Sequence, residues 1–301
     1  MTRAVLTALV AMAALTAPAA ADDEDRAIVL PGATGTEGVA RFNGSTFFAG
    51  DLLTGDVFRG RKQGSAEKFI DAPDGRFAAG MKASKSAELL FVAGGPTGQG
   101  YVYSTRTGAP VTSYQFQTPP TPTFINDVAL TKDGAWFTDS AQALLYFVPM
   151  VDGAPSDDVT TLTLSGPAAD LSGAFNNNGI QAVERGEKLI VAHSATGLLN
   201  LVDASTGDSS TIAGVSVPNV DGILLQRREL YAVQNADNRI SVWSLQRGFR
   251  AGELEGTVTS PLFQFPTTVA RLGGKLAVAN AKFDTGFPPT ATEYEVVVVR
   301  R

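Results

Sequence analysis

Short runs of apolar and aromatic residues recur along the chain, and each run ends in a small polar turn before a second apolar run follows. Six such pairs of runs can be recognised, at residues 47–59, 90–104, 136–148, 189–203, 230–244 and 276–300. Aromatic and β-branched residues bounded by Asp, Ser, Asn and Gly predict β-strands joined by tight turns. A repeat of this kind predicts a radial or stacked architecture.

The spacing of the repeats indicates which architecture this is. The first strand of each repeat is expected to begin near Glu37, Ala79, Asn126, Asn178, Asp221 and Thr267. Successive starts lie 42 to 52 residues apart, which is the length of one four-stranded propeller blade. The sequence therefore predicts an all-β fold, a six-bladed β-propeller with four-stranded blades around a central channel.

The last repeat has one strand too few for a complete blade. It supplies strands at residues 267–272, 275–280 and 294–300, whereas residues 27–30 form an apolar strand that precedes the first repeat. A ring left open would expose unpaired strand edges. We therefore expect the N-terminal strand at 27–30 to pair with the strand at 294–300 and close the ring.

The first 21 residues predict a cleaved signal peptide. Arg3 supplies the positive charge, residues 4–16 form the apolar stretch, and Ala19, Ala20 and Ala21 precede Asp22 as a small-residue cleavage site. A membrane anchor is the alternative, but the apolar run is short for a bilayer span. We expect a secreted or periplasmic protein in which residues 22–301 form a single propeller domain.

The composition narrows the classes of partner. The chain lacks cysteine, which excludes disulfides, thiolate metal sites and cysteine catalysis. Its net charge of −6 argues against binding to nucleic acid or to anionic membranes. A monomeric state is the default expectation, and a small-molecule substrate is expected from the resemblance described below.

Four oxygen-bearing side chains share one position in the repeat. Glu37, Asn126, Asn178 and Asp221 each open the first strand of a blade, and Gly38, Gly179 and Gly222 follow three of them. Because first strands line a propeller channel, these side chains should converge at one end of it. Two carboxylates and two amides suit a hard cation such as Ca²⁺, whereas Zn²⁺ prefers His and Cys ligands. The alternative is turn chemistry, in which Asn-Gly and Asp-Gly pairs adopt positive φ.

These residues also carry a resemblance to a known family. Glu37-Gly38, the segment NDVALTKDGAWFTDS that begins at Asn126, Asn178-Gly179 and Asp221-Gly222 resemble the SMP-30/gluconolactonase/LRE-like six-bladed propellers. The segments 30–40 and 265–283 look like the secreted bacterial and fungal branch of that superfamily, with paraoxonases and strictosidine synthase-like proteins as distant kin.

The resemblance implies a divalent metal at the top of the channel, most naturally Ca²⁺. Glu37, Asn178 and Asp221 match the metal ligands of the family, and Asn126 matches an Asn that touches metal or substrate. Family enzymes hydrolyse lactones or related esters, with the metal polarising the carbonyl and an acidic residue activating water. Asp221 is the expected catalytic base, and Glu37 is expected to act as an electrostatic ligand.

Two departures from the family pattern bear on the substrate. Phe124 stands where sugar-lactone members carry an Arg, which favours an apolar lactone or ester. Paraoxonase-like members use a His pair, whereas this chain has only His193, which we interpret as a turn or rim residue. Two functions therefore stay open: a secreted metal-dependent hydrolase, and a non-catalytic binding or scaffold module with a structural calcium.

Other polar residues near the strand ends have a structural interpretation. Asp51, Asp139, Ser194, Asn235 and Asn280 are assigned to one repeat position and interpreted as turn caps. Asp127 is expected either to point away from the channel or to support its neighbour Asn126.

Overall fold

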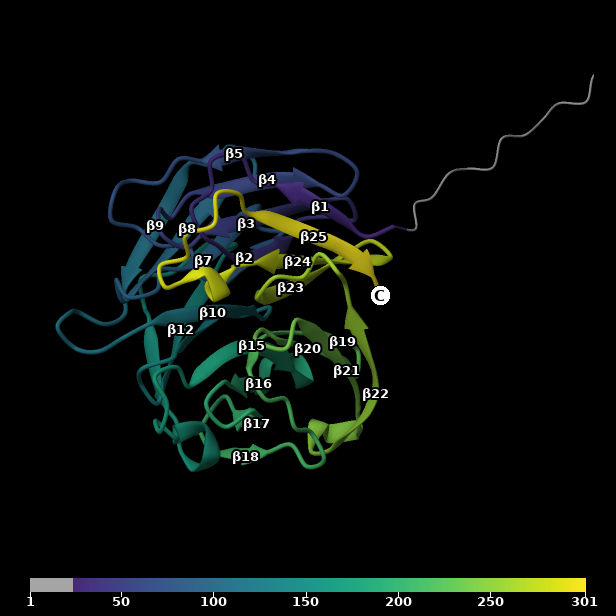
Figure 1. Ribbon diagram of the computed structural model, residues 1–301. Helices are drawn as coiled ribbons and strands as arrows, with labels where there is room; N and C mark the ends of the chain where they lie inside the picture. The colour runs from purple at the N-terminus through teal and green to yellow at the C-terminus, as the bar shows by residue number, and fades with distance from the viewer. Residues whose placement is uncertain (1–23) are drawn as a thin grey trace, which may run out of the picture.

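Six antiparallel sheets form a ring around a central channel in the computed structural model, which describes residues 24–301 (Figure 1). The predicted signal peptide, residues 1–21, lies outside the described residues. The strands next to the channel are β2 (Thr36–Arg41), β6 (Met81–Ser84), β10 (Ile125–Leu130), β15 (Asn177–Val183), β19 (Val220–Gln226) and β23 (Pro266–Leu272). Their positions confirm the predicted blade starts to within two residues.

Three further strands complete each blade. The second strands are β3 (Thr46–Asp51), β7 (Leu89–Ala93), β11 (Gly134–Asp139), β16 (Lys188–His193), β20 (Glu229–Gln234) and β24 (Lys275–Asn280). The third strands are β4 (Val57–Arg61), β8 (Gln99–Ser104), β12 (Leu144–Val151), β17 (Leu198–Asp203), β21 (Arg239–Leu245) and β25 (Glu295–Arg300). The outer strands are β5 (Ala66–Ile70), β9 (Pro110–Gln115), β14 (Thr160–Thr163), β18 (Ser209–Thr211), β22 (Gly252–Thr259) and β1 (Arg26–Val29).

The N-terminal strand closes the ring, as the sequence predicts. β1 pairs antiparallel with β25, so that Ile28 lies opposite Val296. The first described strand thus forms the outer edge of the last blade, so strands from the beginning and the end of the described residues share one sheet (Figure 1). The edge of β25 that three strands would leave unpaired is covered.

The remaining elements are short. β13 (Ala154–Pro155) extends the third blade by pairing with β12. Four 3₁₀ turns interrupt the loops: η1 (Gly166–Ala169), η2 (Glu184–Gly186), η3 (Arg247–Phe249) and η4 (Phe283–Thr285). Within residues 24–301, no helix has the length and apolar character that a bilayer crossing requires.

The hydrophobic core is divided among the interfaces between neighbouring blades. Six clusters of buried side chains are found, and each joins residues of two adjacent sheets. The cluster between the last and first blades contains Ile28, Phe47, Phe58 and Val296, all of which are at most 2% exposed. Trp136 and Trp243 pack within two other clusters. Because these layers hold the blades rigidly, the inner strands present fixed positions to the channel.

Candidate metal centre

Five of the six inner strands begin with the same irregularity. β2 pairs with β3 at Thr36 and next at Val39, three residues on, while the partner strand moves only from Asp51 to Ala49. The same one-residue bulge recurs in β10, β15, β19 and β23. Bulges redirect side chains and are frequent beside functional sites. The bulged pairs are Glu37-Gly38, Asn126-Asp127, Asn178-Gly179, Asp221-Gly222 and Thr267-Thr268.

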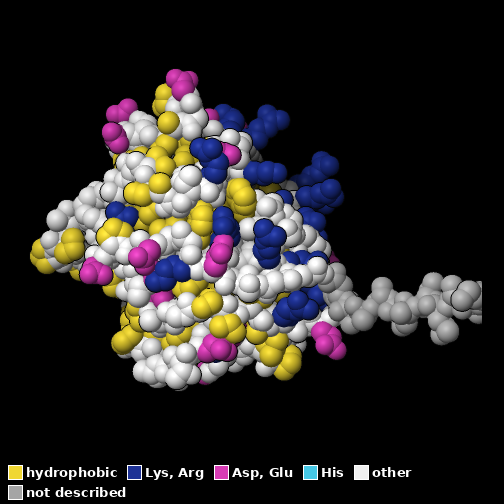
Figure 2. Space-filling model, turned by 90° about the horizontal axis from the view of Figure 1, so that it is seen from above, with side chains coloured by type: hydrophobic (Ala, Val, Ile, Leu, Met, Phe, Trp, Pro, Cys, Tyr) yellow, Lys and Arg dark blue, Asp and Glu magenta, His cyan; other side chains and the backbone are white. Residues whose placement is uncertain are grey.

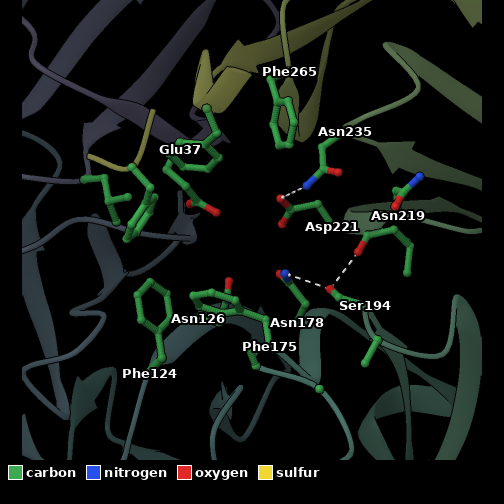
Figure 3. Close-up of a pocket in the computed structure, with 17 residues that line it drawn as sticks. Glu37, Phe124, Asn126, Phe175, Asn178, Ser194, Asn219, Asp221, Asn235 and Phe265 are labelled. Atoms are coloured by element: carbon green, nitrogen blue, oxygen red, sulfur yellow. Dashed lines mark hydrogen bonds between the residues drawn. The ribbon is translucent and has the colours of Figure 1, made fainter. Parts of the chain in front are cut away.

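The four predicted ligands come together at one end of the channel. Glu37, Asn126, Asn178 and Asp221 all line a single cavity of about 430 Å³. Their side chains point toward one another across it (Figure 3). Each of these residues is only 4–6% exposed. The bulge therefore delivers one polar side chain from each of four blades to the same buried space.

The glycines of these pairs serve close packing rather than turn formation. Gly38, Gly179 and Gly222 are not among the residues with positive φ, so the turn interpretation of these pairs is wrong. A Cβ on Gly179 would lie 2.7 Å from the carbonyl oxygen of Asp221, on the next blade. A Cβ on Gly38 would collide with the backbone of Ala79 in the same way. Glycine lets adjacent inner strands approach each other just below the cavity.

Serine side chains fix the orientation of the two amides. Asn126 donates from Nδ2 to Ser140 Oγ at 2.9 Å, and that hydroxyl donates to the carbonyl oxygen of Asn177 on the next blade at 2.6 Å. Asn178 and Ser194 repeat the arrangement, at 3.1 Å, with Ser194 donating to Val220 O at 2.7 Å (Figure 3). Because each amide nitrogen is held by its serine, each Oδ1 is left for the cavity.

The two carboxylates are held differently. Asn235 donates from Nδ2 to Asp221 Oδ2 at 3.1 Å, which leaves Oδ1 toward the cavity (Figure 3). Glu37 is anchored through its backbone, because its carbonyl oxygen accepts from the hydroxyls of Thr267 and Thr268 at 2.7 and 2.8 Å. Its side chain projects into the cavity from β2.

One oxygen of each predicted ligand has no partner in the structure. Glu37 Oε2, Asn126 Oδ1, Asn178 Oδ1 and Asp221 Oδ1 are buried and accept no hydrogen bond from the described residues. A buried polar atom left without a partner costs about 1–3 kcal/mol. Four such oxygens around one cavity fit a hard cation with oxygen ligands. The donor set comprises two carboxylates and two amides. Within residues 24–301, no cluster of three or more His, Cys, Asp or Glu side chains is suited to a metal.

The electrostatics of the channel favour the same ion. Burial raises the pKa of Glu37 well above its ordinary value, and the charges of Asp221 and Asp127 raise it further. Burial likewise raises the pKa of Asp221, to about 7, although Asn235 partly opposes the shift. Asp127 is also buried, and Lys82 Nζ lies 3.9 Å from its Oδ1. With all three carboxyls ionised, these groups and the Lys82 ammonium would carry a net charge of −2, which one divalent cation would balance.

Aromatic side chains form the wall of the cavity on the solvent side. Phe124, Phe175, Phe265, Phe283 and Phe287 all line it. Phe124 and Phe175 meet edge to face with ring centroids 5.1 Å apart. Phe283 contacts the rings of Phe265 and Phe287. Phe175 and Phe287 are 41% and 67% exposed. The cavity thus has a polar floor and an apolar mouth, a common arrangement in small-molecule sites.

Two supporting residues were wrongly interpreted from the sequence. Asp139 pairs with the first residue of its inner strand. His193 and Gln234 pair with the first residues of their own inner strands, so these three residues share one repeat position. Ser194 and Asn235 therefore follow that position by one residue, and they hold Asn178 and Asp221 instead of capping turns. Ser140, which the sequence argument did not single out, holds Asn126. Its repeat position, matching that of Ser194, was the available signal.

The other interpreted residues are structural. Asp51, Asp139 and Asn280 accept hydrogen bonds from loop backbone N–H groups, as turn caps do. His193 is fully buried, with Nε2 2.8 Å from the carbonyl oxygen of Asp170. Asp127 does not line the cavity and accepts from the backbone N–H of Ile180 on the next blade.

Comparison with known proteins supports the fold class. No family model matches the sequence, and no curated protein matches it. Among solved structures, the chain is similar to the allergen Mala s 1 of Malassezia sympodialis, with a TM-score of 0.63, 14% identity, and coverage of 86% of this chain and 91% of that one. A protein from Lactobacillus plantarum gives a TM-score of 0.58 and 15% identity over 81% of this chain and 77% of that one.

A WD40 propeller is also similar. The domain of Doa1 matches with a TM-score of 0.56 and 13% identity over 91% of this chain and 96% of that one. At such identities, structural similarity defines the fold alone. Together with the strand pairing, it places the chain among the β-propellers, and six blades define its class.

Proposed function

We propose that this protein is a metal-dependent hydrolase of lactones or esters, of the SMP-30/gluconolactonase type, with a divalent cation bound at the polar floor of the cavity. The observation that carries the proposal is the set of four buried, unpartnered oxygens on Glu37, Asn126, Asn178 and Asp221. Calcium is the favoured ion because all four donors are oxygens.

The residues of the chain divide the catalytic work. A divalent cation held by these four side chains would polarise a substrate carbonyl and stabilise the negative charge that develops on its oxygen. Asp221 is the proposed base. Its Oδ2 is held by Asn235 and its Oδ1 faces the cavity, where a carboxylate can accept a proton from water. Glu37 would contribute negative charge that helps to hold the cation.

The mouth of the cavity favours an apolar substrate. Phe124 packs edge to face against Phe175, where a sugar-binding member of the family would present a guanidinium. A ring of phenylalanines can bury an alkyl or aryl group but offers no hydrogen bond to sugar hydroxyls. We therefore propose apolar lactones or aryl and alkyl esters as substrates. We also propose that the protein is secreted or periplasmic and monomeric.

The proposal is tested by metal analysis combined with a panel of lactones and aryl esters. Metal-free wild-type protein should bind Ca²⁺ in calorimetry and, once loaded, hydrolyse members of the panel. Asp221→Ala should lose both properties. Asp133→Asn, which changes an exposed carboxylate on the β10–β11 turn, should retain both.

Two results would replace the proposal. If wild-type protein binds calcium but hydrolyses nothing in the panel, the non-catalytic alternative holds, and the protein is a binding or scaffold module with a structural ion. If wild-type protein binds no divalent cation, the four oxygens are not a metal site.

A further inference from the structure

The mouth of the channel opposite the metal centre is a second, separate cavity. All six inner strands contribute to it with residues near their C-terminal ends, and its volume is about 440 Å³. Four basic side chains line it, from Arg41, Lys82, Arg227 and Arg271, and neither Asp nor Glu is among its lining residues. The chain as a whole carries a net charge of −6, so this cluster does not reflect a generally basic surface.

A second depression adjoins the first and extends its basic character. It has a volume of about 420 Å³, shares Gln226, Arg227 and Arg271 with the first, and adds Arg228 and Arg301. Its one carboxylate, Glu229, is already bonded to Arg301 through two contacts of 3.2 and 2.5 Å. Figure 2 shows that Lys and Arg side chains gather over one part of the ring wall in view rather than spreading evenly.

Three cationic groups of the two depressions lack a carboxylate partner among residues 24–301. Arg41, Arg227 and Arg228 make no ion pair with the residues that the structure describes. Lys82 Nζ reaches only one carboxylate, Asp127, at 3.9 Å. Like charges gathered around a hollow repel one another, and an anion bound there relieves the repulsion.

Gln226 and Arg227 add evidence that the position is built to bind. Both polar atoms of the Gln226 amide are buried without a hydrogen-bond partner, and this side chain lines both depressions. Arg227 has a φ of 62°, a left-handed conformation that Gly and Asn adopt more readily than Arg. A long cation is therefore placed at the boundary of the two depressions although the backbone favours a smaller residue.

We propose that this basic mouth, lined by Arg41, Lys82, Gln226, Arg227 and Arg271, binds a small polyanion that carries more than one phosphate or sulfate group. Guanidinium groups match tetrahedral oxyanions with paired N–H donors. Two adjoining depressions accommodate two such groups, and the Gln226 amide supplies a donor between them. The inference does not require the function proposed for the other end of the channel.

Calorimetry with tripolyphosphate as the probe tests this site. Metal-free protein is used, because tripolyphosphate chelates divalent cations. Wild-type protein should bind tripolyphosphate more tightly than inorganic phosphate, and affinity should fall as salt is added. Arg227→Asn, which keeps a residue suited to the turn, and Arg41→Ala should each weaken binding about tenfold, the loss of one charge-assisted hydrogen bond.

Two controls separate the site from general charge effects. Arg106→Ala removes an equally charged side chain whose guanidinium lies beside Glu88 on the second blade, and Asp221→Asn alters the other end of the channel. Both should leave tripolyphosphate affinity unchanged. Failure of wild-type protein to bind the probe at low salt, or an equal loss in Arg106→Ala, overturns the proposal.

A vesicle assay identifies the source of the anion. Sedimentation with phosphatidylcholine vesicles that contain phosphatidic acid compares a lipid headgroup with the free probe. Binding of tripolyphosphate without binding of vesicles supports a soluble phosphate ester as the ligand. Vesicle binding that is lost in Arg227→Asn supports the same site acting on a lipid headgroup.

Discussion

At the scale of single residues, the serines behind the candidate metal centre determine which atom of each amide faces the cavity. An Asn side chain can offer either its nitrogen or its oxygen, and Ser140 and Ser194 each accept a hydrogen bond from the nitrogen. Both serines then donate to the next blade, so their own hydrogens are used. Second layers of this kind orient metal ligands and tune affinity. Both amides are consequently set as acceptors before any ion arrives.

The buried carboxylates predict an unusual response to pH. In metal-free protein, burial raises the pKa of Asp221 from 3.8 to about 7 and raises that of Glu37 as well. A carboxyl whose pKa is higher in the folded state stabilises the fold below its unfolded pKa, and that stability is lost as pH rises through the folded value. Asp221 should therefore reduce stability between about pH 4 and pH 7, by about 1.4 kcal/mol per pH unit.

Calorimetric unfolding in the presence of a chelator measures this effect. The melting temperature of Asp221→Asn minus that of wild-type protein should increase as pH rises through this window. Added Ca²⁺ should raise the melting temperature of wild-type protein at neutral pH and leave that of the variant unchanged. Parallel pH profiles for the two proteins, with chelator, would contradict the assignment.

At the scale of the element, the bulge in the inner strand is what forms the site. The sequence shows that Glu37, Asn126, Asn178 and Asp221 share one repeat position, and this is enough to predict that they converge. It does not show the bulge, because no residue type marks an extra residue in a ladder. Turn chemistry was the alternative considered for the glycines that follow, and the structure instead shows that they permit close packing of neighbouring inner strands.

The close-packing role of glycine predicts an asymmetry among glycine substitutions. In Gly179→Ala the new methyl group would lie 2.7 Å from both Asp221 O and Ile223 N, which are backbone atoms that cannot rotate away. We expect a loss of about 1–3 kcal/mol in the free energy of unfolding, as in other overpacked sites. Gly256→Ala on β22 meets no atom within 4 Å and should change stability by less than about 0.5 kcal/mol. Denaturant titration compares the two, and equal effects would refute the packing argument.

At the scale of the whole molecule, the ring depends on a strand that precedes the first repeat. Periodicity and the need to cover an edge were sufficient to predict that residues 27–30 close the last blade, and β1 does pair with β25. The details of the site were less accessible, because Ser194 and Asn235 lie one residue beyond the repeat position to which the sequence assigned them. Strand pairing resolves such errors, and sequence spacing does not.

Closure of the ring should therefore be sensitive to one side chain of β1. Ile28 is 2% exposed within the cluster between the last and first blades, whereas its neighbour Val29 is 38% exposed. Ile28→Ala should lower the free energy of unfolding by about 2–4 kcal/mol. Val29→Ala on the same strand should have a small effect. If thermal melts show the two variants to be alike, β1 does not contribute to closure.

The recurring bulge also has a consequence for how the metal centre can change. Because the bulged pair interrupts the regular ladder, the side chain that it carries toward the axis is not required for strand pairing in its blade. Glu, Asn, Asp and Thr occupy equivalent places in different blades. Four of the blades thus supply one exchangeable side chain each to the proposed coordination sphere. The charge and ligand number of the centre can be altered one blade at a time, while the propeller that carries it stays the same.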